Sequence, residues 1–191
     1  MKATLSARLF RRCLLWIYRR GRWTVTGSAP AERKFVLIAV PHTTGMDLPN
    51  LLGAGHDLGV DLHFMAKRQL FRWPLGRFLR GVGGVPVDRS RPGGMVAQMA
   101  AEFAARDEFV LTIAPEGTRE RVKDWKSGFY RIAEAADVPI VCGYMDYEGR
   151  RVGLGPVIHP TGNYEDDMTE ALAFYDDVLP GGYAGRLKTP A

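Results

Sequence analysis

Short apolar runs of strand length alternate with helix-like segments along this 191-residue chain. Such alternation is typical of an α/β domain with parallel strands, because returning to the same end of a sheet requires a crossover, usually a helix. We therefore predict a central, mostly parallel sheet flanked by helices, with a short edge strand at 23–26 and an antiparallel edge from a hairpin at 148–154. The expected strands cover 35–40, 61–66, 108–113 and 138–144, and the expected helices 47–58, 93–106, 128–136 and 164–178. A further helical stretch after Lys67 is interrupted by Pro74.

The sequence divides into three parts. We predict an amphipathic helix over 1–22, a globular domain over 23–180, and a Gly/Pro-rich tail over 181–191. With 46% hydrophobic and 25% charged residues, the chain has enough apolar material for a core and no low-complexity segment.

The N-terminal part is strongly basic. Residues 1–31 include seven lysines and arginines and no acid, and apolar residues recur between the arginines at helical spacing. A basic amphipathic helix of this kind binds an anionic membrane surface, packs on its own domain, or binds nucleic acid, and the first two roles are compatible. We favour the membrane surface, without nucleic acid as a partner. No run approaches the roughly 18 apolar residues of a spanning helix, so we expect peripheral attachment.

The two cysteines, Cys13 and Cys142, lie far apart without a partner pattern. This argues against a disulfide framework and against a zinc site, and it favours a reducing compartment. We therefore expect a cytoplasmic protein on the inner face of the cell membrane, with no metal.

The first candidate site follows the apolar run 35–40, where Pro41 precedes His42 and Asp47 comes five residues later. Five residues do not share one face of a regular helix, so a turn through Gly45 has to bring the two side chains together. A carboxylate on one imidazole nitrogen fixes the tautomer and raises the basicity of the other nitrogen, which makes a general base. The alternative is a histidine at a helix start with an aspartate in the first turn.

Cationic residues follow the other strand-like runs in the same way. Lys67, Arg89 and Arg119 each come after an apolar run, as His42 does. Because parallel strands end at one edge of a sheet, we expect these four residues to line one cleft. Cations beside glycine-rich turns are typical of a phosphate site, and the alternative is ordinary surface arginines.

Other catalytic schemes fit poorly. The chain has no Gly-x-Ser-x-Gly elbow, and Cys142 lies inside a predicted buried strand. His56, His63 and His159 have no metal-type spacing, and the glycines at 81–84 lack a dinucleotide or P-loop pattern.

Four sequence blocks, in order over about residues 35–145, resemble the glycerolipid acyltransferases, which include the 1-acyl-glycerol-3-phosphate acyltransferases. The blocks are His42 to Asp47, the 84–89 stretch ending in Asp88-Arg89, Pro-Glu-Gly-Thr-Arg at 115–119, and Val-Pro-Ile-Val at 138–141. The spacing of Lys67, Leu70-Phe71, Pro74 and Gly76 is also similar.

The resemblance implies that His42, oriented by Asp47, deprotonates an acceptor hydroxyl, which then attacks an acyl-CoA or acyl-carrier-protein thioester without an acyl-enzyme. It implies no bound cofactor, since the thioester is a co-substrate. The implied acceptor is a lysophosphatidic-acid-like lipid. Its phosphate would be held by Arg89 and the block Glu116, Gly117, Thr118 and Arg119, with Lys67 as a further candidate.

Several positions depart from the family pattern. Pro41 replaces an asparagine, Ala114 an aromatic residue, Glu120 a serine and Cys142 a proline. These changes keep the implied reaction class but leave the acceptor open to a lyso-ornithine lipid or another lysophospholipid. A different class of function is a non-catalytic module that binds a lipid surface or nucleic acid through the basic helix.

Overall fold

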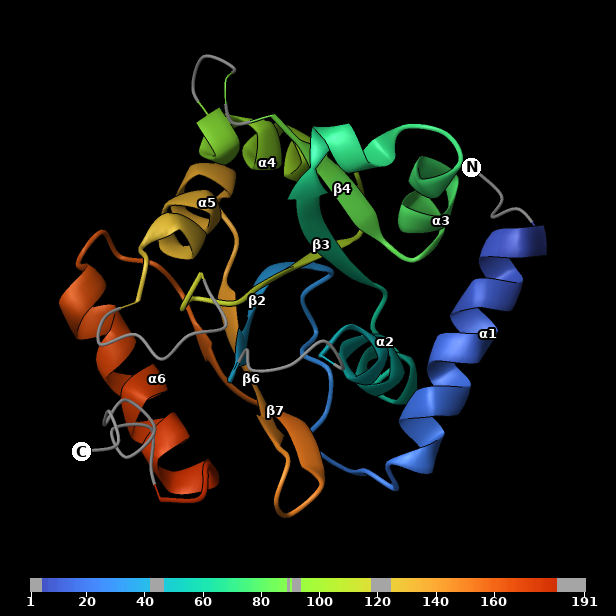
Figure 1. Ribbon diagram of the computed structural model, residues 1–191. Coiled ribbons are helices and arrows are strands. Elements are labelled where there is room, and N and C mark those ends of the chain that lie inside the picture. Colours follow the sequence, from blue (N-terminus) through green and yellow to red (C-terminus); the bar gives the residue numbers. More distant parts are fainter. Residues whose placement is uncertain (1–4, 42–46, 89, 91–93, 118–124, 182–191) are drawn as a thin grey trace, which may run out of the picture.

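The computed structural model describes residues 5–41, 47–88, 90, 94–117 and 125–181. A single seven-stranded sheet runs through the middle of the molecule, with α2 on one face and α4, α5 and α6 on the other (Figure 1). The helices are α1 (Leu5–Arg20), α2 (Asp47–Asp57), α3 (Leu75–Gly81), α4 (Gly94–Ala104), α5 (Gly128–Ala136) and α6 (Tyr164–Val178), with the 3-10 helix η1 (Arg68–Phe71) before α3. The predicted architecture is thus confirmed, including the break in the helix at Pro74.

The sheet has the strand order β1-β7-β6-β2-β5-β3-β4. Its strands are β1 (Thr24–Thr26), β2 (Lys34–Val40), β3 (Leu62–Lys67), β4 (Gly84–Val87), β5 (Phe109–Ile113), β6 (Ile140–Asp146) and β7 (Arg151–Ile158). The five strands from β6 to β4 are mutually parallel, and β7 pairs antiparallel with β6. The antiparallel strand is not the edge that the sequence predicted, because β1 adds beyond it, parallel to β7.

Two apolar layers enclose the sheet. Side chains facing α4, α5 and α6 form the larger core, with Phe35 and Leu37 of β2 turned to the opposite face toward α2. Tyr175 of α6 is fully buried, and its hydroxyl donates to the carbonyl oxygens of Ile38 and Gly143, each at 3.1 Å. These two contacts fix α6 across β2 and β6, and β2 is one of the strands that lead to the site described below.

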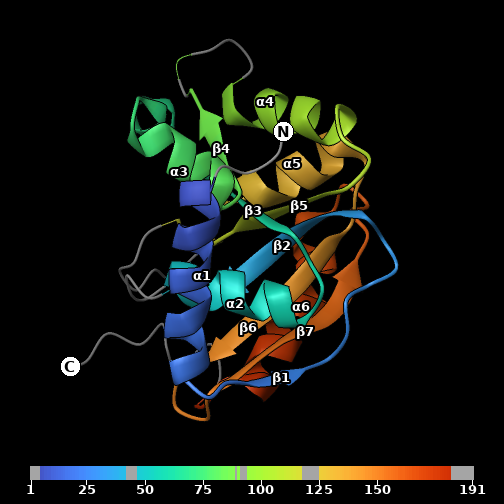
Figure 2. The same ribbon diagram turned by 90° about the vertical axis from the view of Figure 1, so that its right-hand side faces the viewer.

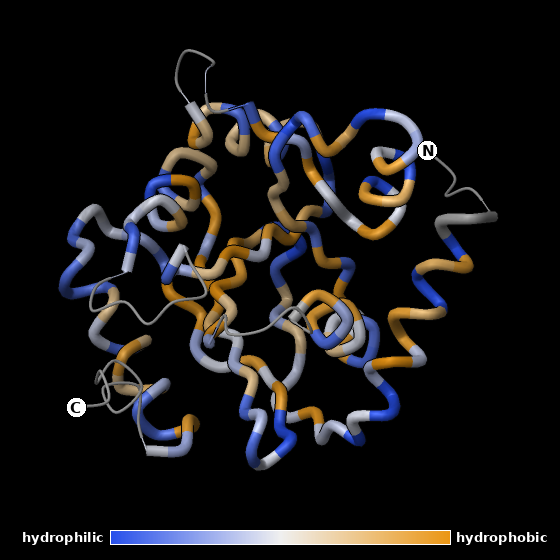
Figure 3. The backbone as a smooth tube through the Cα atoms, viewed as in Figure 1, coloured by the Kyte–Doolittle hydropathy of each residue, from blue (hydrophilic) through white to orange (hydrophobic). Residues whose placement is uncertain are grey.

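The basic helix α1 packs on the domain through one face. Leu14 and Tyr18, four residues apart, are buried, and Leu14 joins a cluster with Leu52 of α2 and Val82. At the other end of α1, the Phe10 ring meets the Phe78 ring of α3 edge-on, with 6.0 Å between centroids. The opposite face of α1 is open to solvent, where apolar and basic residues alternate along the helix (Figure 3).

Candidate active site

Four neighbouring parallel strands end at one edge of the sheet. In the order β2, β5, β3, β4, their pairings include Ile38 with Ile113 and Lys67 with Val87, which aligns the carboxyl ends. The turns that carry the predicted site residues therefore start from adjacent positions, as expected for a parallel sheet. Asp47 begins α2 beside this edge. His42, Arg89, Thr118 and Arg119 lie outside the described residues, as does the side chain of Asp47, so their roles stay predictions.

The turn after β4 is held by a side chain that sequence reasoning missed. Gln98 of α4 accepts a hydrogen bond from the Asp88 backbone N–H at 3.0 Å and donates to the Asp88 carbonyl at 2.5 Å. The Asp88 carboxylate accepts from the Ser90 backbone N–H and hydroxyl, and Arg68 reaches it at 3.5 Å. The backbone immediately before position 89 is thereby fixed from α4. No motif or spacing in the sequence points to Gln98.

The turn after β5 is compact. Gly117 has a positive φ of 65°, which favours glycine, and its N–H donates to the Ala114 carbonyl at 3.1 Å. A Cβ at Gly117 would lie 2.7 Å from Cδ of Lys126, so the lysine side chain lies across this glycine. Glu116 is buried. Sequence reasoning also missed Lys126, whose stretch carries no recognisable motif.

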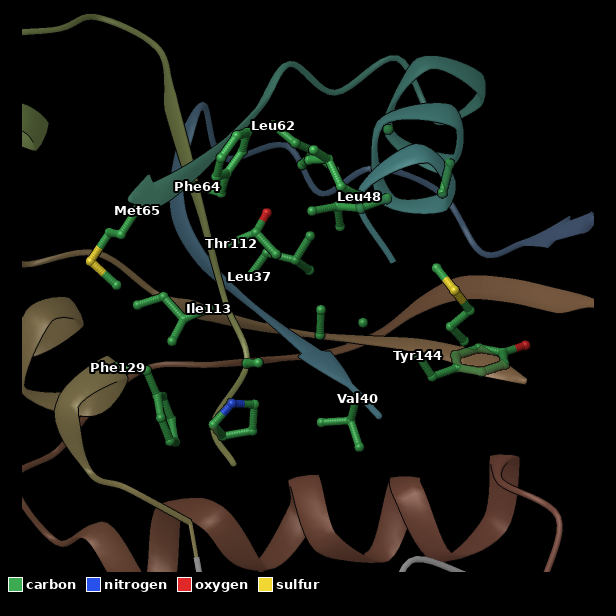
Figure 4. A pocket seen from close by; sticks show the side chains of 18 of the residues that line it. Leu37, Val40, Leu48, Leu62, Phe64, Met65, Thr112, Ile113, Phe129 and Tyr144 are labelled. Atoms are coloured by element: carbon green, nitrogen blue, oxygen red, sulfur yellow. The ribbon is translucent and has the colours of Figure 1, made fainter. Parts of the chain in front are cut away.

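A cavity of about 810 Å³ opens at this edge of the sheet. Its rim includes Pro41, Gly117 and two lysines, Lys67 and Lys126. Beyond the rim the lining is mostly apolar, with Thr112 as a polar exception (Figure 4). Met65, Ile113 and Phe129 of α5 line it on one face of the sheet, and Leu37, Leu62 and Phe64 line it on the other.

One face of α2 forms the wall opposite the sheet. Leu48, Leu51, Gly55 and Leu58 line the cavity and recur at intervals of three or four residues, as one helix face does. Leu48 is in the first turn of α2, next to the site edge, whereas Leu58 follows the end of α2. Phe35 and Val60 also line the cavity, and they lie near the start of β2 and just before β3, at the opposite end of the strands. The cavity therefore extends from the carboxyl ends of the strands along the whole of α2. A volume of this size and an apolar lining suit a long apolar ligand with a polar end at the rim.

Among the residues described, the remaining reactive side chains do not form a second centre. Cys142 is fully buried in β6, and burial raises the pKa of its thiol to about 12, so the thiolate needed for nucleophilic attack is suppressed. His63 packs against the Phe109 ring at 4.8 Å between centroids, and burial lowers its pKa. No group of three metal-ligating side chains occurs in the described parts of the chain.

Residues 22–146, about two thirds of the chain, match the family model described as Acyltransferase. The chain belongs to the acyltransferase family. It is also 36% identical over 115 residues to the 1-acyl-sn-glycerol-3-phosphate acyltransferase of Bacillus subtilis (strain 168), an alignment that covers 59% of this chain and 55% of that protein. The chain thus spans about half the length of this relative.

The fold of a solved acyltransferase is similar. The 1-acyl-sn-glycerophosphate (LPA) acyltransferase PlsC from Thermotoga maritima superposes with a TM-score of 0.58, covering 86% of this chain and 76% of that one, at 18% sequence identity. At this identity the likeness concerns the fold alone. The family assignment confirms the resemblance drawn from the four sequence blocks.

Proposed function

We propose that this protein is an O-acyltransferase that moves a fatty acyl group from an acyl-CoA or acyl-carrier-protein thioester to the free hydroxyl of a lysophosphatidic-acid-like acceptor. The observation that carries the proposal is the apolar cavity along α2, which opens where the strands leading to His42, Lys67, Arg89 and Glu116 end. Membership of the acyltransferase family supports the reaction class. The relative from Bacillus subtilis is named for an acceptor of this kind.

The proposed chemistry needs one base. His42, oriented by Asp47, takes the proton of the acceptor hydroxyl as its oxygen attacks the thioester carbonyl carbon. The tetrahedral intermediate collapses by breaking the C–S bond, and the protonated His42 returns the proton to the leaving thiolate. One ester forms, one thioester is lost, and a free thiol is released. Because the acyl group passes directly to the acceptor, no enzyme nucleophile takes part, which agrees with the suppressed thiolate of Cys142.

The cavity and its rim suit the two parts of such a reaction. A fatty acyl chain is a long, uncharged hydrocarbon, and the apolar side chains along α2 would remove it from water. An acceptor phosphate carries negative charge, and the rim supplies Lys67 and Lys126 beside the turns that lead to Arg89 and Arg119. We assign the acceptor phosphate to this rim.

The proposed substrates are bilayer lipids, so the enzyme has to work at a membrane. We propose that α1 lies on an anionic membrane surface with its solvent-exposed face. That face carries Leu9, 62% exposed, and Trp16, 58% exposed, with the Arg20 guanidinium 4.3 Å from the centroid of the Trp16 ring. Apolar and aromatic side chains flanked by arginines are typical of helices that lie in the headgroup region. In the described part of the chain, no helix is both long enough and apolar enough to cross a bilayer.

Thiol release measured during turnover tests the reaction class. Wild type would be supplied with palmitoyl-CoA or palmitoyl-carrier protein, with and without lysophosphatidic acid. We expect acceptor-dependent thiol release that falls about 10²–10⁴-fold in His42→Ala, the usual contribution of a general base. His56→Ala is the matched control, because His56 is exposed at the end of α2 and should leave turnover unchanged.

The other outcomes discriminate between functions. Thiol release without an acceptor would indicate a thioesterase. Turnover with lyso-ornithine lipid or another lysophospholipid in place of lysophosphatidic acid would keep the reaction and change the acceptor. A folded protein that binds vesicles or oligonucleotides, but transfers no acyl group to any acceptor of such a panel, would indicate the non-catalytic module.

A further inference from the structure

A second exposed amphiphilic element lies next to α1. Residues 68–77, here called the hook, comprise η1, the turn at 72–74 and the start of α3. Trp73 at the tip is 82% exposed, and Leu70 and Leu75 on either side of it are also exposed. Large apolar side chains are rarely left this open together unless they meet a partner.

The local sequence of the hook carries charge of one sign, although Asp88, farther along the chain, reaches Arg68. Between Asp61 and Asp88 the sequence contains no acid, and five cations, Lys67, Arg68, Arg72, Arg77 and Arg80, fall in this interval. Arg72 and Arg77 are exposed on either side of Trp73. The hook thus repeats, on a different element, the combination of exposed tryptophan, leucine and arginine that α1 carries.

The hook is held in a fixed shape. Gly76 packs so closely that a Cβ there would lie 2.1 Å from the Phe71 carbonyl oxygen, and its N–H donates to the Arg72 carbonyl at 2.8 Å. Phe71, within the hook, is buried, and the Arg80 guanidinium lies 5.2 Å from the centroid of the Phe71 ring. Trp73 is therefore presented by a folded turn, so little conformational entropy is lost when it meets a partner.

The hook and α1 belong to the same side of the molecule. The Phe10–Phe78 contact joins α1 to α3, and the view onto this side shows the two helices next to each other (Figure 2). The hook also begins directly after Lys67, which is part of the cavity rim. A surface that contacts both elements would therefore lie beside the opening of the cavity.

From these observations we infer that the hook is a second membrane contact, in which Trp73, Leu70 and Leu75 enter the headgroup region of an anionic bilayer while Arg72 and Arg77 bind lipid phosphates. The inference rests on the proposed membrane association of α1 and extends it. If α1 alone contacts the membrane, the domain can rotate about the axis of α1. Two contacts fix the orientation of the domain on the membrane and hold the cavity opening against the lipid. A bilayer is favoured over nucleic acid because the exposed leucines gain from burial in lipid and have no comparable partner on a phosphate backbone.

Partitioning of the full-length protein onto vesicles tests the inference. Vesicles of equal parts phosphatidylglycerol and phosphatidylcholine would be sedimented with wild type and variants. We expect Trp73→Ala to weaken partitioning roughly tenfold or more, the scale of burying one large apolar side chain. Arg72→Gln should weaken it about fivefold, as expected for one cation near an anionic surface. Added salt should abolish the Arg72→Gln effect and leave the Trp73→Ala effect, because only the charge interaction is screened.

Matched controls lie on the far side of the sheet. Leu172→Ala on α6 removes an apolar side chain about as exposed as Leu70 and Leu75, and Arg131→Gln on α5 removes an exposed guanidinium. Both should bind vesicles as wild type does. Trp16→Ala reports the α1 contact separately and should also weaken partitioning.

The possible results separate this inference from the proposed reaction. If Trp16→Ala weakens partitioning while Trp73→Ala and Arg72→Gln bind as wild type does, the hook is not a contact and α1 alone remains. If the protein binds oligonucleotides but not vesicles, and Arg72→Gln weakens oligonucleotide binding, the partner is a nucleic acid. Turnover of octanoyl-CoA with a water-soluble short-chain lysophosphatidic acid should be unchanged in Trp73→Ala, so failure of acyl transfer would be seen independently of vesicle binding.

Discussion

The ring of Tyr18 in α1 lies directly on Gly53 in α2, so close that a Cβ on Gly53 would be 2.0 Å from the ring Cγ atom. Tyr18 is buried by this contact. Glycine is needed here for the close approach of two helices. The contact shows that α1 is packed on the domain through one face, while its other face stays open for the proposed membrane surface.

Gly53→Ala should therefore destabilise the protein. The added methyl group has to displace the Tyr18 ring, and overpacking of this kind costs about 1–3 kcal/mol, although alanine itself favours a helix. Urea unfolding measures the loss. Gly128→Ala is the matched control, since a Cβ there meets only the end of the Met95 side chain at 3.4 Å and should cost little. Equal stability of the two variants would contradict the packing seen for α1.

The Asp88–Gln98 contact predicts an effect on the acceptor. Gln98→Glu removes the N–H donor to the Asp88 carbonyl and places a carboxylate beside it, so the backbone before Arg89 loses its support. If Arg89 binds the acceptor phosphate, we expect the KM for lysophosphatidic acid to rise about tenfold. This is the scale expected when one hydrogen bond of about 1 kcal/mol is lost and Arg89 is displaced from the phosphate. The KM for the thioester should stay unchanged.

A purely structural role of Gln98 would give a different pattern. Loss of folding stability with both KM values unchanged, or equal increases in both, would contradict the positioning of Arg89 through this turn. Ala97→Glu is the control, because Ala97 is exposed on α4 beside Gln98 and the change adds a carboxylate without removing the donor to Asp88.

Sequence reasoning located most elements because their boundary signals are local. The ends of α5 and α6 agree with the expected 128–136 and 164–178, and α6 starts where Asn163 caps a turn rich in acids. Strand β7 is longer than the hairpin arm that the sequence predicted. The prediction was too short because Gly153, Gly155 and Pro156 interrupt the apolar pattern that marks a strand. The position of β1 next to β7 depends on pairing between residues far apart in the sequence, which no local pattern encodes.

The candidate site was only partly accessible to the same reasoning. The shared edge of the four strands followed from the parallel sheet, since the rule is topological. The cavity did not, because Leu51 and Leu58 have the same chemistry whether they fill a core or line a channel. Gln98 and Lys126 reach the edge from later helices and loops, so their contribution depends on three-dimensional contacts alone.

The cavity along α2 predicts how acyl-chain length is selected. Leu58→Trp adds volume at the end remote from the rim, so a long chain can no longer extend fully while a short one still fits. We expect kcat/KM for palmitoyl-CoA to fall about 10–200-fold, the range for mismatched apolar pockets, with octanoyl-CoA affected far less. Leu172→Trp on the exposed face of α6 is the control. Equal losses for both thioesters would show that the chain does not reach Leu58.

The hairpin between β6 and β7 predicts how stability depends on pH. Asp146 is buried, and burial alone would raise the pKa of its carboxyl. Hydrogen bonds from the Gly149 N–H, the Arg151 guanidinium and the Glu148 N–H outweigh that effect and lower the pKa below its usual value of 3.8. A folded-state pKa below the unfolded one means that the stabilisation is present above about pH 4 and is lost as the pH falls through the folded-state pKa.

Asp146→Asn should therefore lower the free energy of unfolding by about 2 kcal/mol at pH 7, the scale of charged hydrogen bonds, with the gap to wild type closing at more acidic pH. Urea unfolding at pH 7 and pH 3 measures the gap, and a gap of the same size at both values would show that the charge of Asp146 does not support the hairpin.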